Sequence, residues 1–168
     1  MTDTQSLDLP PALEGAVSAL LATACHRNLR LATAESCTGG LLASILTDVE
    51  GYGHAFDRGF VVYTDAAKAD LLGLDRAFIA REGAVSRPVA VAMADGAIDR
   101  SDADAAVAVT GFAGPGAPGE EEGLVHFAAA RRSGATIHRE CHFGPIGRGP
   151  VRLKCLEAAV EMLGEVLA

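Results

Sequence analysis

Apolar and polar residues follow two patterns along this chain. Apolar residues recur at three- and four-residue steps in some segments, which is typical of helices with one buried face, and short continuous apolar runs between them are typical of buried strands. The helices that this pattern predicts span, in chain order, about residues 10–28, 38–46, 66–72, 88–100 and 151–167, with a shorter helical turn at 75–80. The predicted strands span residues 29–34, 60–63, 105–109, 124–130 and 136–143.

The order of these elements predicts the fold class. Helices separate the first strands, which favours parallel pairing, whereas only residues 131–134 join the last two strands, which favours an antiparallel hairpin. We therefore expect an α/β protein with three α/β/α layers around a mixed, mostly parallel sheet of about five strands. Residues 1–10 are expected to form a flexible leader and residues 11–168 a single domain, because a chain of 168 residues can build one sizeable core.

The composition argues against two classes of partner. Hydrophobic residues make up 49% and charged residues 21% of the chain, which is ordinary for a globular protein. Aromatic residues make up only 5%, with no tryptophan, so little surface is available for base stacking. A formal net charge of −8 also opposes general affinity for nucleic acid or an anionic membrane. We expect neither partner, and an anionic ligand would need a local positive site.

The cysteines and the N-terminus bear on the compartment. Cys25, Cys37, Cys141 and Cys155 show neither C-x-x-C spacing nor a histidine at ligand spacing, so we expect no metal site and no disulfide framework. The first ten residues lack the basic start and apolar core of a signal peptide, and no apolar run approaches the roughly 20 residues of a membrane span. The sequence therefore predicts a cytoplasmic protein with reduced thiols and no membrane partner.

Three of the predicted strands end in polar or glycine-rich turns. The carboxyl ends of parallel strands share one edge of a sheet, where α/β proteins bind ligands, so these turns are expected to converge on one site. The three turns contain Glu35-Ser36-Cys37-Thr38-Gly39-Gly40, Tyr63-Thr64-Asp65-Ala66-Ala67-Lys68, and Thr110-Gly111 with Gly114-Pro115 following.

Ser36 is the candidate nucleophile of this site. A serine hydroxyl needs a base at neutral pH, and none of the five histidines lies at one of these turns. Lys68, one of only two lysines, can act as the base if partial burial and a helix N-terminus lower its pKa. Tyr63, at the end of a strand, could relay or donate a proton. The glycine-rich third turn could offer backbone N–H groups to an oxyanion or a phosphate.

Each of these residues also has an ordinary structural interpretation. A serine between a strand and a helix is usually a helix cap, and a lone lysine on a helix is usually a solvated charge. A tyrosine that ends a strand usually belongs to the core or its rim. Cys37 is an alternative nucleophile, although a cysteine packed between layers is the more common case. The residue types alone therefore predict a candidate Ser/Lys/Tyr site at the edge of an α/β sheet.

Six ordered motifs nevertheless match a known family. From about residue 12 to 168 the chain resembles the CinA C-terminal domain family, whose stand-alone members are nicotinamide-nucleotide amidohydrolases. The motifs are Glu35-Ser36-Cys37-Thr38-Gly39-Gly40, Phe56-x-x-Gly59-Phe60-Val61-x-Tyr63, Lys68-x-x-x-Leu72-Gly73, Gly83-Ala84-Val85-Ser86, Met93-Ala94-x-Gly96 and Thr110-Gly111-x-Ala113-Gly114-Pro115.

The resemblance implies a fold similar to the anticodon-binding α/β/α domain and a reaction that converts nicotinamide mononucleotide (NMN) to nicotinate mononucleotide and ammonia. It places the catalytic serine, lysine and tyrosine at Ser36, Lys68 and Tyr63, and it implies neither metal nor cofactor. The expected substrate-binding residues are Thr38, Gly39, Gly40, Thr110, Gly111 and Arg148, with Arg152 one turn further along.

Three further expectations complete this picture. We expect a homo-oligomer, most simply a dimer, because the apolar helices of a small α/β domain leave room for an interface. Two other functions stay open: a nucleotide-binding domain without turnover, and an amidase for another small amide. Two loops, residues 116–124 and 144–148, depart from the family's usual pattern, so a changed substrate specificity also stays open.

Overall fold

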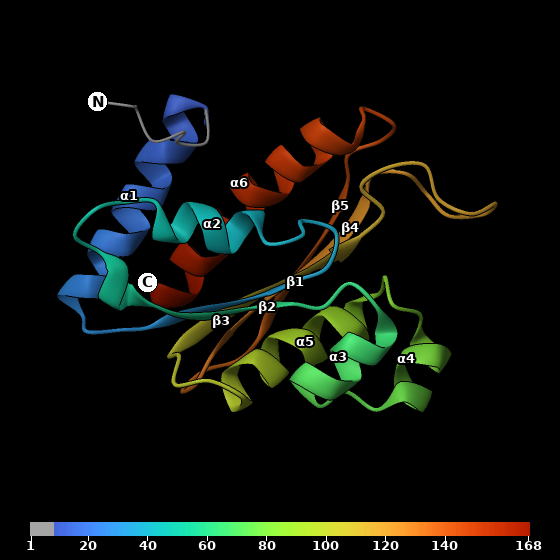
Figure 1. The fold of residues 1–168 in the computed structure, drawn as a ribbon, viewed down its shortest axis with the longest axis horizontal. Helices are drawn as coiled ribbons and strands as arrows, with labels where there is room; N and C mark the ends of the chain where they lie inside the picture. The colour runs from blue at the N-terminus through green and yellow to red at the C-terminus, as the bar shows by residue number, and fades with distance from the viewer. Residues whose placement is uncertain (1–8) are drawn as a thin grey trace, which may run out of the picture.

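A five-stranded sheet with the strand order β2-β1-β3-β4-β5 runs through the middle of the protein (Figure 1). The computed structural model describes residues 9–168, so most of the expected leader, residues 1–8, lies outside the described residues. The strands are β1 (Leu31–Glu35), β2 (Phe56–Val61), β3 (Ala105–Gly111), β4 (Leu124–Arg131) and β5 (Ile137–His142). The helices are α1 (Pro11–His26), α2 (Leu41–Thr47), α3 (Asp65–Leu72), α4 (Arg76–Glu82), α5 (Arg87–Asp99) and α6 (Arg148–Leu167), with a 3-10 turn, η1 (Gly53–Ala55).

The sheet is mixed, as expected. β1 pairs in parallel with both β2 and β3, whereas β3 with β4 and β4 with β5 pair antiparallel. Four strands consequently point the same way, and β4 alone among the five runs against them. The last two strands form the predicted hairpin. The carboxyl ends of β1, β2 and β3 lie at one edge, with Glu35 opposite both Val61 and Val109.

Two helical layers cover the sheet, with α1, α2 and α6 on one face and α3, α4 and α5 on the other (Figure 1). Side chains on a strand alternate between faces, which the central strand β3 shows directly. Its Ala105, Val107 and Val109 belong to the core under α1, α2 and α6, while Ala106 and Ala108 belong to the core under α5. The continuous apolar run of β3 therefore reflects burial on both faces.

Gly96 sets the approach of α5 to the end of α3. A Cβ on Gly96 would lie 2.4 Å from the carbonyl oxygen of Leu72, a distance at which the two helices would have to separate. The absence of a side chain thus allows the second helical layer to pack closely.

The extent of β2 differs from the prediction of residues 60–63. β2 begins at Phe56 and ends at Val61, so Tyr63 follows the strand. β2 is an edge strand that is only partly buried, and its polar Asp57-Arg58 pair breaks the apolar run on which the prediction depended. Its pairing with β1, rather than its own hydrophobicity, defines it.

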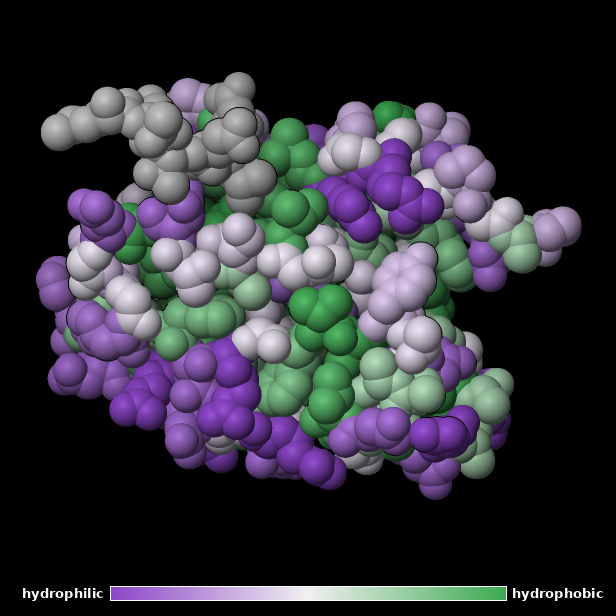
Figure 2. Space-filling view, viewed as in Figure 1, coloured by the Kyte–Doolittle hydropathy of each residue, from purple (hydrophilic) through white to green (hydrophobic). Residues whose placement is uncertain are grey.

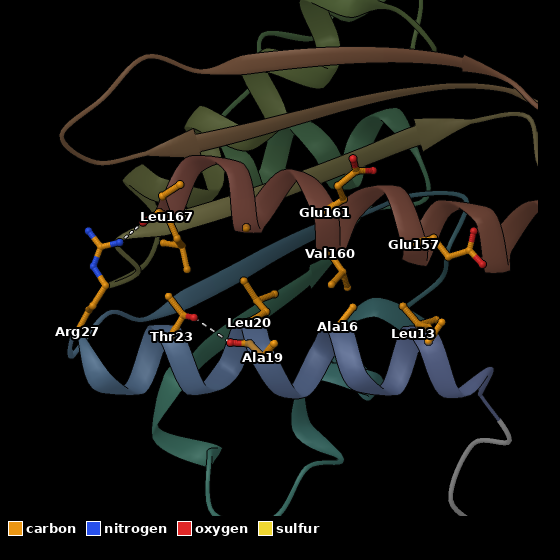
Figure 3. Close-up of a pocket in the computed structure, with 13 residues that line it drawn as sticks. Leu13, Ala16, Ala19, Leu20, Thr23, Arg27, Glu157, Val160, Glu161 and Leu167 are labelled. Atoms are coloured by element: carbon orange, nitrogen blue, oxygen red, sulfur yellow. Dashed lines mark hydrogen bonds between the residues drawn. The ribbon is translucent and has the colours of Figure 1, made fainter.

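α1 and α6 lie side by side and leave an apolar groove between them of about 630 Å³ (Figure 3). We call this the α1/α6 groove. Its lining includes Leu13, Ala16, Ala19 and Leu20 of α1 and Val160, Gly164 and Leu167 of α6. Arg27 lies at one end, where its Nη1 donates to the carbonyl of Leu167, and Glu157 lies at the other.

The surface is mixed in polarity. In the orientation of Figure 1, hydrophobic residues gather between α1 and α6 and near the centre of this face, and hydrophilic residues gather along the lower margin (Figure 2). Within residues 9–168, no helix is both long and apolar enough to cross a membrane.

Candidate active site

Ser36 lies directly beyond the last residue of β1, at the edge where the three parallel strands end. Its backbone N–H donates to the carbonyl of Val109 on β3 at 3.0 Å, and the Val62 N–H donates to the carbonyl of Glu35 at 2.8 Å. These two bonds tie the residue pair 35–36 to the strands on both sides. The expected convergence of the strand ends is therefore present, and it fixes the backbone of Ser36.

Lys68 reaches Ser36 from the other side of this edge. Thr64 caps α3 by accepting from the Ala67 N–H at 3.1 Å, and Lys68 follows in the first turns of that helix. Its side chain is only 1% exposed, and Nζ lies 3.5 Å from Ser36 Oγ. Nζ also donates to the carbonyl of Tyr63 at 3.4 Å. The hydroxyl and the amine are thus adjacent, at the outer limit of a hydrogen bond.

The surroundings of Lys68 favour its neutral form. Burial lowers the pKa of the Lys68 amine below its usual 10.5, and the nearby Asp65 opposes part of this effect. A neutral amine has a lone pair that can accept the Ser36 proton, and its N–H groups can still donate to the Tyr63 carbonyl. Burial, one of the two causes expected from the sequence, has the largest influence on this pKa.

Tyr63 contributes its backbone rather than its hydroxyl to this arrangement. The residue is 65% exposed, and its carbonyl oxygen accepts the hydrogen bond from Lys68. Tyr63 nevertheless lines the cavity described below. The structure therefore places its ring at the rim of the site.

The third strand end supplies the opposite wall. Thr110 is buried, and its Oγ1 donates to the carbonyl of Ala84 at 2.8 Å, which ties the loop 83–86 to the end of β3. Ala84 and Val85 consequently line the site together with Gly111 and Phe112. The sequence pointed to this loop only as a helix start and a family motif, and its place in the cavity wall is a finding of the structure.

These elements surround a cavity of about 300 Å³, near the lower end of the range for small-molecule sites, which is about 300–1,000 Å³. Six of the residues expected at the site line it: Ser36, Tyr63, Lys68, Thr110, Gly111 and Arg148. Arg148, the first residue of α6, lies against Gly114, where a Cβ would come 3.0 Å from the guanidinium. Glu120, which the sequence did not single out, lines the cavity as well.

Three residues expected to bind substrate do not line this cavity. Thr38 is buried, and its hydroxyl is a buried polar atom without a hydrogen-bond partner among residues 9–168. Gly39 and Gly40 have positive φ angles of 63° and 100°, so they serve the tight turn into α2. Arg152 lies behind the turn, where its Nε donates to the carbonyl of Cys37 at 2.8 Å.

Cys37, the alternative nucleophile, packs into the core beneath α6. Its side chain is 3% exposed and neighbours Cys155, and a hydrogen bond from Cys155 lowers the pKa of Cys37 while the pKa of Cys155 is raised. The packing beneath α6 favours Ser36 as the group presented to the cavity. Cys37 remains one residue away and lines part of the wall.

No histidine is found among the residues that line the cavity. His126 lies nearby, opposite Thr110 in the β3–β4 ladder, but its Nδ1 lies 3.1 Å from His138 Nε2. Within residues 9–168, no cluster of three or more His, Cys, Asp or Glu side chains has an arrangement that could hold a metal ion. Of the groups that line the cavity, the Lys68 amine lies at hydrogen-bonding distance from Ser36 Oγ.

Known proteins share this architecture. A model of the CinA C-terminal domain matches residues 13–167. The nicotinamide-nucleotide amidohydrolase PncC of Escherichia coli is 41% identical over 97% of this chain and 95% of that protein. A CinA-like protein of Akkermansia muciniphila is 51% identical over 68% of this chain, which spans only 29% of that longer relative. The crystal structure of the competence/damage-inducible protein CihA from Agrobacterium tumefaciens superposes with a TM-score of 0.93 at 43% identity, covering 98% of this chain and all of that one. This chain therefore belongs to the CinA C-terminal domain family.

Proposed function

We propose that this protein is an amidohydrolase that converts NMN and water to nicotinate mononucleotide and ammonia. The observation that carries the proposal is the buried Lys68 amine 3.5 Å from the Ser36 hydroxyl, in a cavity of small-molecule size. The relative PncC, a nicotinamide-nucleotide amidohydrolase with which this chain aligns over 97% of its length, supports the choice of substrate.

The geometry is suited to a covalent mechanism in two stages. In the first, Lys68 takes the proton of the Ser36 hydroxyl as Oγ attacks the carboxamide carbon. The resulting ammonium then gives a proton to the departing nitrogen, so that ammonia leaves and an ester to Ser36 remains. In the second, Lys68 takes a proton from water and the hydroxide attacks the ester. The Lys68 ammonium then returns the proton to Ser36 Oγ as the ester bond breaks and nicotinate mononucleotide leaves. The glycine-rich turn 111–116 is our candidate for donors to the oxyanion.

Ammonia release from purified protein and NMN tests this function directly. We expect multiple turnovers with NMN and much slower release from nicotinamide, which lacks the ribose and phosphate. Calorimetric binding of NMN without ammonia would instead support a nucleotide-binding domain, and release from another small amide alone would support an amidase of different specificity.

Arg148 is proposed to bind the phosphate of the substrate. It is a cation on the wall of the cavity, whereas Arg152 is bonded to the Cys37 carbonyl behind the turn. Because a charge-assisted hydrogen bond contributes about 1.5–3 kcal/mol, Arg148→Gln should raise the KM for NMN roughly 10- to 100-fold with a small change in kcat. Steady-state kinetics with NMN and with nicotinamide riboside, which lacks the phosphate, measure this.

The riboside is the internal control of that experiment. The substitution should leave kcat/KM for nicotinamide riboside nearly unchanged. If both substrates lose the same factor, Arg148 does not bind phosphate. A change in KM confined to Arg152→Gln would assign the phosphate to that residue instead.

We also propose that two copies associate through the α1/α6 groove. The groove is mostly apolar, with Thr23 and Glu161 also in its lining, Arg27 at one end and Glu157 at the other (Figure 3). A two-fold axis across the groove would place Arg27 of one copy near Glu157 of the second copy, twice in each dimer. Glu157 also pairs with Lys154 at 2.7 Å, an exposed contact that contributes little stability and can be exchanged.

Light scattering coupled to size exclusion tests the dimer. The wild type should elute with twice the 17.2 kDa mass of one chain, and Ala16→Glu, which puts a carboxylate into the groove, should elute as a monomer. Ala80→Glu, at an exposed position on α4, is the matched control and should remain dimeric. A monomeric wild type would refute the dimer, and a dimeric Ala16→Glu would refute this interface.

The remaining expectations about partners and compartment stay predictions. The net charge of −8 supports a small-molecule substrate rather than nucleic acid. The absence of C-x-x-C spacing among the four cysteines supports reduced thiols and a cytoplasmic location.

A further inference from the structure

Glu35, the residue that precedes Ser36, is a buried carboxylate with no assigned role. It ends β1, its exposed fraction is 0%, and it does not line the cavity. Removing a carboxylate from water is costly unless its oxygens are hydrogen-bonded. The partners of this side chain therefore indicate what it does.

Both carboxylate oxygens of Glu35 are fully occupied. Oε1 accepts from the Ala43 N–H at 2.8 Å and from the Thr33 hydroxyl at 3.2 Å. Oε2 accepts from the N–H groups of Gly40 and Leu42, at 3.1 and 3.0 Å. A carboxylate can accept about four hydrogen bonds, so this set uses its whole capacity.

Three of these four donors lie where the turn after Ser36 enters α2. The first N–H groups of a helix have no partner within the helix, and α2 lacks a side chain at its N-cap, because Gly40 stands there with φ of 100°. Glu35 performs that capping from the preceding strand. The negative charge at the helix N-terminus adds a favourable interaction with the helix dipole.

The hydrogen bonds of Glu35 join the two ends of the turn 36–40. The carboxylate at the start of the turn binds the backbone at its end, while the Arg152 guanidinium holds the Cys37 carbonyl in between. Ser36 lies within this loop, and its N–H is bonded to β3. A change at Glu35 would therefore move Ser36 relative to Lys68, whose position on α3 does not depend on the turn.

We infer that Glu35 is a positioning residue for Ser36: its carboxylate fixes the turn 36–40 and with it the distance between Ser36 Oγ and Lys68 Nζ. The inference rests on the proposed function only in that Ser36 is the nucleophile. A misplacement of about 1 Å in a reacting group can slow a reaction about 100-fold, so the effect on rate should exceed the effect on binding.

Glu35→Gln is the sharpest substitution because it preserves shape and removes acceptor capacity. An amide nitrogen in place of Oε2 would face the N–H groups of Gly40 and Leu42, and in place of Oε1 it would face that of Ala43. The Thr33 hydroxyl can rotate to accept a proton, but at least one backbone donor stays without an acceptor. Glu35→Asp retains the charge and shortens the reach by one methylene group.

The control is a substitution that destabilises the fold far from the site. Arg132 donates to the carbonyls of Ile98, Ser101 and Ala103 at the opposite end of the sheet. Arg132→Gln removes most of these bonds without touching the turn 36–40. Thermal unfolding of each variant sets an assay temperature at which all of them are folded.

We then measure kcat and KM for ammonia release from NMN, and the rate at which a fluorophosphonate probe phosphonylates Ser36 with loss of fluoride. For Glu35→Gln we expect kcat and the labelling rate to fall together, about 10- to 100-fold, with KM changed much less. Arg132→Gln should lower the melting temperature while both rates stay within about twofold of the wild type. Glu35→Asp, which retains the charge, should lie between Glu35→Gln and the wild type in both rates.

A folded Glu35→Gln with wild-type kcat and labelling rate would overturn the inference and leave Glu35 a purely structural residue. If Glu35→Gln does not fold, Glu35→Asp decides by the same comparison. If the wild type releases no ammonia from NMN, the proposed substrate fails, but the labelling rates still test Glu35, since the probe does not resemble NMN.

Discussion

Ser36→Ala is expected to abolish ammonia release from NMN. Without the hydroxyl no ester can form, and removal of a nucleophile of this kind typically costs about 10⁴- to 10⁶-fold in kcat. The side chain is small and close to the cavity, so the fold and the binding of NMN should be retained. Ammonia release and calorimetric binding of NMN, measured on the same preparation, test the two parts of this prediction.

Two controls make the result specific. Ser44→Ala removes an exposed hydroxyl from α2 and should leave kcat unchanged. Cys37→Ala tests the alternative nucleophile, which lies one residue away and packs beneath α6. Loss of turnover in Cys37→Ala together with normal turnover in Ser36→Ala would assign the covalent step to the thiol.

Lys68→Arg is expected to reduce kcat by about 10²- to 10⁴-fold, the range that general-base catalysis contributes. Arginine keeps the positive charge but does not release its proton at accessible pH, so it cannot accept one from Ser36. Lys154→Arg, the same change at the other lysine, is the matched control and should be neutral. Near-normal turnover in Lys68→Arg would refute the Ser–Lys mechanism.

The protonation state of Lys68 should make the activity of the wild type depend on pH. Burial lowers the pKa of Lys68 below 10.5, and in the proposed mechanism the neutral amine is the form that accepts the Ser36 proton. Activity should consequently be low at acidic pH and rise through a midpoint below 10.5. The same shift affects stability. The unfolded chain binds this proton more tightly, so the contribution of Lys68 to stability increases as pH rises from the lowered pKa towards 10.5.

Lys68→Met should therefore abolish turnover while preserving or raising the melting temperature. Replacement of a buried ionisable amine by an apolar side chain of similar length removes the cost of burying that amine, so the fold should be at least as stable. Such a result would identify the buried amine as a feature retained for chemistry at some cost to the fold.

The hydrophobic pattern of the sequence predicted the helices and strands in the correct order. The predicted helices and strands are present, because burial on one or both faces imposes a period that is visible in the sequence. β2 is the informative exception. It is an edge strand defined by its pairing with β1, and its polar residues Asp57 and Arg58 gave no strand signal.

For the site, the sequence provided Ser36, Lys68 and Thr110 because each was predicted to lie in or just after a turn at the end of a strand; in the structure Thr110 is the penultimate residue of β3, and Lys68 lies in α3. Their convergence depended on parallel pairing of β1, β2 and β3, which the intervening helices predicted correctly. The role that we infer for Glu35 was not foreseen, because three of its four donors are backbone groups that carry no residue-specific signal.

By itself, then, the sequence determined the order of helices and strands, their mixed sheet and the residue types at the strand ends, since these follow from local periodicity and turn chemistry. Only the tertiary structure decided which of those residues meet. It buried the Lys68 amine beside Ser36, placed Tyr63 at the rim of the cavity and left Thr38 out of the cavity lining. It also bonded Arg152 to the Cys37 carbonyl, whereas Arg148 lines the cavity. Burial and side-chain direction depend on packing between elements distant in the chain, and these set both the pKa of Lys68 and its distance from Ser36.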